Sequence, residues 1–227
     1  MTFIELKNVS KVYRLGNQEV RALTDLSLCF EPGEFAVLAG PSGSGKTTAL
    51  NLVGGLDRPT SGEVIVSGVD LGQTSKSSLA DFRLQNIGFI FQSYNLIPVL
   101  TAAENAEFTL MLQKVERGRR RRRVMELFAD LGISGLENRR PADLSGGQQQ
   151  RVAIARAMAA EPQVILADEP TANLDSATAE DLLDLMQRLN SELQTTFIFS
   201  SHDDRVISRG KRVIRLEDGH LVNDRTV

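Results

Sequence analysis

The chain contains few of the features that stabilise secreted proteins or anchor proteins in membranes. Cys29 is its only cysteine, so no internal disulfide can form, which is typical of a reducing compartment. No run of about 18 uninterrupted apolar residues occurs, so we expect no membrane-spanning helix. Glu5 and Lys7 place charges early in the N-terminus, so we expect no signal-peptide core there. The formal net charge is −3, which gives no overall basic field to attract nucleic acid.

The remaining composition is that of an ordinary globular protein. The 227 residues are 41% hydrophobic and 24% charged, which suits one large domain or a core with an inserted subdomain. Short apolar or alternating runs predict strands at 3–9, 20–30, 35–39, 63–66, 87–91, 164–168 and 196–200. Helical spacing predicts helices at 47–54, 146–160 and 178–193, and a hairpin-like pair is expected around Asp218 and Gly219.

Between residues 93 and 140 the pattern changes from strands to helices. Helical spacing there predicts segments at 101–113 and 119–131, and glycines and a proline end the stretch. The order of elements therefore predicts an α/β fold. Its core, 1–92 and 141–227, carries a helical subdomain, 93–140.

A glycine-rich loop separates the predicted strand 35–39 from the predicted helix that follows it. The loop matches the GxxxxGK[ST] pattern and consists of Gly40, Pro41, Ser42, Gly43, Ser44, Gly45, Lys46 and Thr47. Glycines let a backbone wrap closely around a phosphate. Lys46 is suited to placing its ammonium between the β- and γ-phosphates, and Thr47 is suited to ligating Mg²⁺. The strand before the loop and the helix after it favour a phosphate loop over a simple glycine turn.

Further polar residues stand at the ends of predicted strands. Asp168 is suited to holding Mg²⁺ through water, and Glu169 to polarising an attacking water, although two carboxylates can also simply cap a strand. His202 could contact a γ-phosphate or be an ordinary surface histidine. Gln92 could reach Mg²⁺ and the water as a neutral ligand. Tyr13 could stack on adenine or be an ordinary strand aromatic.

A second loop suited to phosphate lies far along the chain. Leu144 to Gln148 read LSGGQ and open an arginine-bearing apolar helix, where backbone N–H groups and a hydroxyl can meet an anion. Two phosphate-type loops so far apart in one chain suggest a nucleotide held between two copies of the protein.

The ordered motifs resemble the nucleotide-binding subunit of ABC transporters over essentially the whole chain. They are Tyr13, the loop from Gly40 to Thr47, Gln92, the LSGGQ segment, VILADE at 164–169, Asn173-Leu174-Asp175 and His202. The resemblance implies a phosphate-loop NTPase (RecA-like) core with an N-terminal antiparallel β subdomain and an inserted helical subdomain. It also implies an ATPase with two ATP and Mg²⁺ buried between two head-to-tail protomers.

The same resemblance assigns roles to individual residues. Tyr13 and residues 40–48, ending at Thr48, would bind ATP, and Thr47, Gln92 and Asp168 would hold the metal. Glu169 would be the catalytic base, with Gln92 and His202 beside it. Ser145, Gly146, Gly147 and Gln148 would contact the γ-phosphate held by the other protomer, and Asp175 would lie at the dimer seam.

Finer features look like the lipoprotein-release, macrolide-efflux and related antimicrobial-peptide-resistance ATPases. These features are the segments 54–62, 91–98 and 100–105. Ala172 and Ser201 depart from that group, which often has glycine and threonine there. The resemblance implies an integral membrane partner, which would place this chain peripherally on the cytoplasmic face of the inner membrane.

The segment after Gln92 is our candidate for the groove that receives the membrane partner. The residues proposed for contact are Tyr94, Leu96, Ile97, Leu100 and Glu104. The alternative is that the apolar ones among them belong to the core of the helical subdomain.

One strong charge run stands out, formed by Arg117 and Arg119 to Arg123. A solvated helix face is the default interpretation, and contact with anionic lipid headgroups or the membrane partner is the sharper one. Nucleic-acid binding is least favoured because no aromatic residues are interleaved.

Other functions in the same family remain open from the sequence. A regulatory scaffold resembling the cell-division ABC ATPase would act on cell-wall enzymes through a membrane partner. Soluble repair members carry a long coiled coil, and translation members carry two cassettes, neither of which fits 227 residues. The resemblance implies that the membrane subunit would bind the transported substrate, so this sequence does not identify it.

Overall fold

The computed structural model describes residues 3–16 and 18–226, and within them ten strands form two sheets. The strands are β1 (Ile4–Leu15), β2 (Gln18–Phe30), β3 (Phe35–Ala39), β4 (Ser61–Val66), β5 (Val69–Asp70), β6 (Ile87–Phe91), β7 (Val164–Asp168), β8 (Thr196–Ser201), β9 (Arg212–Glu217) and β10 (His220–Thr226). The helices are α1 (Lys46–Val53), α2 (Lys76–Asn86), α3 (Ala102–Leu112), α4 (Arg117–Asp130), α5 (Gly146–Ala159), α6 (Ser176–Leu193) and α7 (Asp204–Arg209), with a 3₁₀ turn at Pro141–Asp143.

The larger sheet has the strand order β10-β9-β3-β8-β7-β6 and forms the middle layer of the molecule. Its strands β9, β3, β8, β7 and β6 are parallel, and β10 is antiparallel to β9. Parallel strands put their carboxyl ends at one edge, so the segments that follow β3, β7 and β8 meet there. This edge positions the candidate site.

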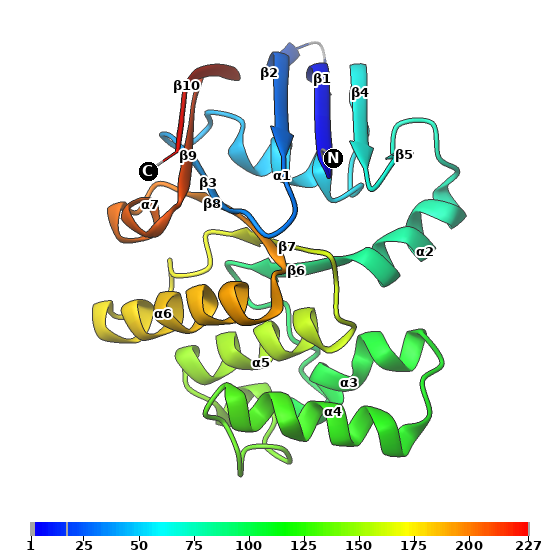
Figure 1. Ribbon diagram of the computed structural model, residues 1–227, viewed down its shortest axis with the longest axis vertical. Coiled ribbons are helices and arrows are strands. Elements are labelled where there is room, and N and C mark those ends of the chain that lie inside the picture. The colour runs from blue at the N-terminus through cyan, green and yellow to red at the C-terminus, as the bar shows by residue number, and fades with distance from the viewer. Residues whose placement is uncertain (1–2, 17, 227) are drawn as a thin grey trace.

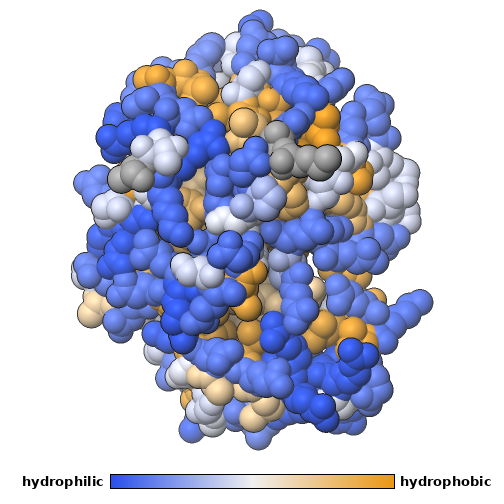
Figure 2. Space-filling model, in the orientation of Figure 1, coloured by the Kyte–Doolittle hydropathy of each residue, from blue (hydrophilic) through white to orange (hydrophobic). Residues whose placement is uncertain are grey.

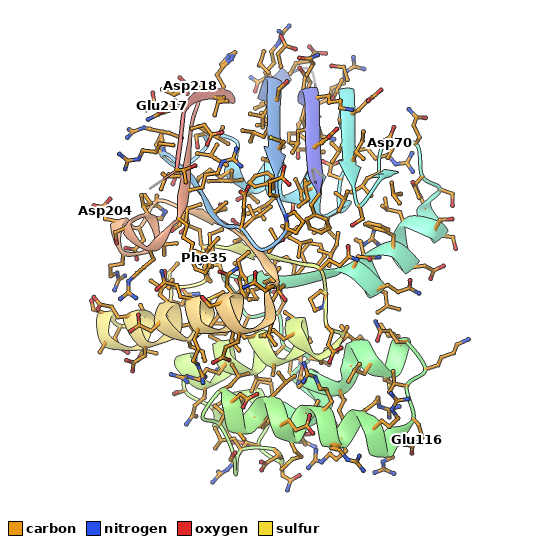
Figure 3. All side chains as sticks on the ribbon, viewed as in Figure 1. Phe35, Asp70, Glu116, Asp204, Glu217 and Asp218 are labelled. Carbon is orange, nitrogen blue, oxygen red and sulfur yellow. The ribbon has the colours of Figure 1, made fainter. Side chains whose placement is uncertain are left out.

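The apolar runs of the middle sheet are buried on both faces, as parallel strands require. Alternation along β3 sends Phe35 and Val37 to one face and Ala36 and Leu38 to the other. On the first face Phe35 packs against Phe197 and Phe199, with ring centroids 5.8 and 4.6 Å away. Figure 3 shows Phe35 in the interior, between the middle sheet and α6.

The smaller sheet is antiparallel, with the order β2-β1-β4-β5, and lies at the top of Figure 1. Its apolar face, including Ile4, Leu6, Val64 and Val66, packs with α1 onto one side of the middle sheet. The predicted strand 3–9 is longer in the structure: β1 runs to Leu15, with irregular pairing to β2 after Leu6, Val9 and Lys11.

The other side of the middle sheet is covered by helices. α3, α4, α5 and α6 bury their apolar residues together against it and form the lower half of Figure 1. The structure thus confirms the α/β fold with an antiparallel β part and a helical part. Within 3–16 and 18–226, no helix has the length and apolarity needed to cross a membrane.

Two helices were not predicted from the sequence. α2 buries only Leu79, and its other residues are largely polar, so it has little hydrophobic periodicity to detect. It is held by the Ser75 cap and by Arg83, whose guanidinium donates to the carbonyl of Gly55 at 2.8 Å. α7 has six residues and buries only Val206.

Candidate functional site

The glycine loop between β3 and α1 has a conformation that requires glycine. Gly45 has a φ of 99°, and a Cβ there would lie 2.5 Å from the carbonyl oxygen of Ala22. The loop is tied to the turn before β10, where the Gly219 N–H donates to the Ser44 carbonyl at 3.1 Å. Among residues 3–16 and 18–226, no side-chain hydrogen bond caps α1, so its first backbone N–H groups are available to an anion.

Two side chains of this loop fit a phosphate ligand. Lys46 is only 6% exposed, and its ammonium donates to the carbonyls of Gly40 and Pro41 at 2.8 Å each. Burial lowers the pKa of Lys46, and the charges of Glu169 and Asp168 oppose that shift. The hydroxyl oxygen of Ser44 is buried and has no hydrogen-bond partner within the described chain, so a polar ligand here would satisfy it.

The structure brings the end of β7 to the loop. The Thr47 hydroxyl donates to Asp168 Oδ1 at 3.0 Å, although 121 positions separate them in the sequence. This contact gathers a hydroxyl and a carboxylate, the oxygen donors that Mg²⁺ prefers.

Glu169 follows directly and forms a second polar cluster. Its Oε1 lies 2.6 Å from Nδ1 of His202, and its Oε2 accepts from the Ser201 hydroxyl at 3.0 Å. The Glu169 side chain is 15% exposed, and that of His202 is 59% exposed. A cavity of about 540 Å³ is lined in part by Gly40, Pro41 and His202, so the loop and His202 border the same open space. A carboxylate held this way can accept a proton from water.

The structure gives little support for a metal-binding role of Gln92. It is exposed after β6, and its backbone carbonyl accepts from the Asn173 amide at 2.9 Å. No hydrogen bond among residues 3–16 and 18–226 joins its side chain to Thr47 or Asp168. Its metal and water role stays a prediction.

Tyr13 lies on β1, and its hydroxyl donates to Asp57 Oδ2 at 2.9 Å. Burial raises the pKa of Tyr13, and the hydrogen bond to Asp57 acts in the same direction, while one to Thr48 opposes it. The structure therefore places the ring beside the first turn of α1. Asp57 belongs to the segment 54–62, but no motif marks it or its partner Lys11 as a site residue in the sequence.

The LSGGQ segment stands apart from this cluster. Ser145 caps α5, accepting from the Gln148 N–H at 3.3 Å, while Gln148 Oε1 accepts from the Ser145 N–H at 3.0 Å. A Cβ on Gly147 would lie 2.6 Å from Thr178, so this glycine permits close contact with α6. Asp175 caps α6, with Oδ1 3.0 Å from the Thr178 N–H.

The two phosphate-type loops do not meet within one chain. α1 lies in the upper half of Figure 1, beside the antiparallel sheet, whereas α5 lies in the lower half. No hydrogen bond within the described part of the chain joins 40–47 to 144–148. The structure brings together the glycine loop, Asp168, Glu169 and His202, and leaves Ser145 to Gln148 and Asp175 elsewhere.

A mainly apolar groove of about 360 Å³ opens between α2, β6, α3 and α5. It is lined by Leu84, Ile87, Gly88, Phe89, Phe91, Asn95, Ile97, Phe108, Thr109, Leu112, Arg156, Ala157 and Ala160. Figure 2 shows apolar side chains beside a notch on the right, between the parts that hold α2 and α3.

The five proposed contact residues divide between this groove and its surroundings. Ile97 lines the groove, and Leu96 packs against the core of the helical side. Leu100 and Glu104 line a separate cavity between α3 and α4. Tyr94 reaches toward Asn173, 3.5 Å from its carbonyl.

The arginine run occupies the first half of α4, which begins after Glu116 at the lower right of Figure 3. Arg120 and Arg121 each approach Glu107 at 3.6 Å, and Arg123 approaches Glu161 at 3.4 Å. The run is therefore partly paired within the fold and partly a solvent-exposed face.

Comparisons with known proteins place this geometry in context. The model of the family described as "ABC transporter" matches residues 23–172. The "Macrolide export ATP-binding/permease protein MacB" of Hyphomonas neptunium is 45% identical over 97% of this chain, which spans 34% of that protein. The "Lipoprotein-releasing system ATP-binding protein LolD 1" of Rhodopseudomonas palustris is 43% identical over 96% of this chain and 97% of its own length.

A solved structure shows the same fold. It is described as the dimeric structure of a post-hydrolysis state of the ATP-binding cassette MJ0796 bound to ADP and Pi. MJ0796 is a protein of Methanocaldococcus jannaschii. The TM-score is 0.91 at 42% identity, covering 99% of this chain and 98% of that one.

Proposed function

Because this chain belongs to the ABC transporter family of ATPases, we propose that it is the motor subunit of a membrane complex of the lipoprotein-release or macrolide-efflux type. Relatives named for both systems support this subgroup. The macrolide-export relative includes a permease in its name, and this chain matches only its ATP-binding third. In our proposal the chain drives an integral membrane permease partner.

The hydrolytic step is assigned to the residues at the carboxyl edge of the middle sheet. Residues 40–48 bind the phosphates, with the Lys46 ammonium moving from the loop carbonyls to the β- and γ-phosphates. Glu169 accepts a proton from the attacking water, while Ser201 and His202 hold its carboxylate in place. His202 also contacts the γ-phosphate, and Gln92 orients the water.

The oxygen donors beside the loop fit a magnesium ion. The Thr47 hydroxyl and Asp168 Oδ1 already lie 3.0 Å apart, and Gln92 follows β6, the strand that pairs with β7. We propose that these three side chains hold Mg²⁺ with ATP, where the ion would neutralise phosphate charge.

The observation that carries the proposal is the separation of the two phosphate-type loops. A loop at 40–47 and an LSGGQ segment at 144–148 share no hydrogen bond within one described chain. In a head-to-tail homodimer, Ser145 to Gln148 of one protomer read the γ-phosphate held by the other, with Asp175 at the seam. Two ATP are buried this way, and loss of the γ-phosphate removes the target of the partner's groups, so hydrolysis opens the dimer.

The groove beside Phe108 is the proposed contact for the membrane partner. Its lining is mainly apolar and includes Ile97 from the segment after Gln92, and Leu112, which also lines it, is 50% exposed. In this proposal 93–140 is a helical subdomain inserted into the core, 1–92 and 141–227. The chain lies peripherally on the cytoplasmic face of the inner membrane.

The proposal is tested by capture from native membranes. Tagged chain is purified from detergent-solubilised membranes with ATP present, and the proteins that accompany it are identified. Leu112→Asp should remove the partner. Val222→Asp, which changes a similarly exposed apolar residue on β10, should retain it. Both variants should still hydrolyse ATP when isolated.

The identity of the partner decides the subgroup. A four-helix partner with a large extracytoplasmic domain supports force transmission across the membrane. A many-helix partner with a substrate path makes the chain a conventional transporter motor. A partner that controls cell-wall enzymes supports the regulatory alternative. Retention of the partner by Leu112→Asp would reject the groove as the contact site for the membrane partner.

A further inference from the structure

The segment after α1 is fastened along β1. The Thr60 N–H donates to the Ser10 carbonyl at 2.8 Å, and the Thr60 hydroxyl accepts from the Val12 N–H at 3.0 Å. The same segment is tied back to α1, because the Asn51 carbonyl accepts from the N–H groups of Leu56 and Asp57 at 2.8 and 3.2 Å. This segment, residues 54–60, is called the strap below. It joins the helix of the phosphate loop to the strand that carries Tyr13.

Three side chains meet at the centre of this strap. The Lys11 ammonium lies 2.7 Å from Asp57 Oδ1 and 2.8 Å from the Arg58 carbonyl. The Tyr13 hydroxyl donates to the other oxygen of Asp57 at 2.9 Å. The Lys11 ammonium also stands 4.8 Å from the centre of the Tyr13 ring, over its face. One carboxylate thus fixes both the tip of the ring and the cation that covers one side of it.

The charges of the cluster are matched and partly shielded. The Lys11 side chain is 12% exposed and that of Asp57 is 31% exposed, so their attraction is stronger than that of a fully solvated pair. A cation over one ring face is favourable and prevents that face from receiving a base. A base would therefore stack on the opposite face, with the ring held against sliding by its hydroxyl.

We propose that Lys11 and Asp57 are positioning residues that fix Tyr13 as the platform for the base of ATP. The inference rests on the proposed function, because it concerns the same nucleotide site. The strap sets the distance between the platform and the phosphate loop, since Asp57 is bound both to Tyr13 and to the last turn of α1. Tyr13 and the phosphate loop are thereby parts of one connected unit, which binds both the base and the phosphates of ATP.

The test separates recognition of the base from recognition of the phosphates. Lys11→Met and Asp57→Ala are compared with the parent by steady-state hydrolysis of MgATP, with inorganic tripolyphosphate as a competitive inhibitor. Each variant should raise KM for ATP about fivefold and leave kcat within about twofold. Inhibition by tripolyphosphate, which has no base, should be unchanged. Lys11→Arg, which keeps a cation over the ring, should restore most of the parent KM.

The control is Arg14→Gln, which breaks an exposed ion pair with Glu19 on the neighbouring strand and leaves the cluster intact. Parent-like KM in both Lys11→Met and Asp57→Ala would overturn the inference. Equal weakening of ATP and tripolyphosphate would also overturn it, because it would mean general damage to the phosphate loop. A parent chain that neither binds nor hydrolyses ATP would instead overturn the proposed function itself.

Discussion

The two helices that follow phosphate-type loops begin in different ways. α1 begins after Gly45, a glycine with positive φ, and no side chain caps it. α5 begins after Ser145, and a reciprocal pair of hydrogen bonds with Gln148 closes its first turn. Both starts carry glycines and a hydroxyl nearby, so their sequences suggest the same chemistry.

The difference concerns where each helix start finds its acceptors. The first N–H groups of α1 have no side-chain acceptor within the described part of the chain, so a bound phosphate would satisfy them directly. Those of α5 are satisfied in part by Ser145 itself, whose hydroxyl proton remains available to donate outward. The loop 40–47 can thus hold a phosphate without help from a second protomer. The segment 144–148 is stable without a ligand and can bind a phosphate brought by a second protomer.

The sharpest way to separate the two loops is to stop hydrolysis after ATP has bound. Glu169→Gln keeps the size of the side chain but removes proton acceptance, so kcat should fall about a thousandfold. ATP should then hold a dimer that size-exclusion chromatography detects. Glu161→Gln, the same change beyond the opposite end of β7, should behave as the parent. Parent-rate turnover in Glu169→Gln would reject the assigned base.

The next largest effect is expected at the loop that holds its ligand alone. Lys46→Ala removes the buried ammonium and should weaken ATP binding about a hundredfold or more, measured by titration calorimetry. Lys76→Ala, on the exposed surface of α2, is the matched control. Unchanged affinity in Lys46→Ala would contradict a phosphate-binding role for 40–47.

Two substitutions at Ser145 separate the cap from the ligand contact. Ser145→Ala loses the cap and should cost about 1 kcal/mol in the free energy of unfolding, measured with urea. Ser145→Asp keeps a good cap, so stability should stay near the parent, but its charge would repel a phosphate from the partner. In the Glu169→Gln background, Ser145→Asp should therefore prevent the ATP-dependent dimer. An ATP-dependent dimer as stable as that of Glu169→Gln alone would reject the contact between Ser145 and the partner's phosphate.

The smallest effect is expected from pH at the start of α6. Hydrogen bonds from the Thr178 N–H and hydroxyl hold the pKa of Asp175 below its ordinary value of 3.8. A lowered folded-state pKa stabilises the protein above the unfolded value, and this contribution is lost as the pH falls through the folded value. Asp175→Asn should therefore lower the melting temperature at pH 7, and this effect should diminish progressively as the pH falls below about 4. A pH-independent difference would exclude this titration.

Much of the fold could be predicted because its signals are local. The apolar runs of β3, β7 and β8 and the glycine loop are each contiguous, and the structure confirms all of them. α2 could not be predicted, because Arg83 and the Ser75 cap hold it rather than an apolar stripe. The pairing of Lys11 with Asp57 joins residues 46 positions apart and follows no motif.

The candidate site divides in the same way. The contact between Thr47 and Asp168 could be expected, since Thr47 follows β3, Asp168 ends β7, and the carboxyl ends of these parallel strands share an edge. The cap made by Ser145 is a property of α5 that phosphate-based reasoning overlooks. The roles of Gln92 and Asp175 stay predictions.

The pairing of β7 with β8 places Asp168 opposite Ser200, and so brings Glu169 level with Ser201 and His202. The alignment depends on how many residues precede the site in each strand. Apolar residues along either strand can exchange for others of similar volume with modest cost. A single insertion or deletion would turn the following side chains to the opposite face. Protein engineers can therefore vary the composition of these strands widely while their lengths must stay constant.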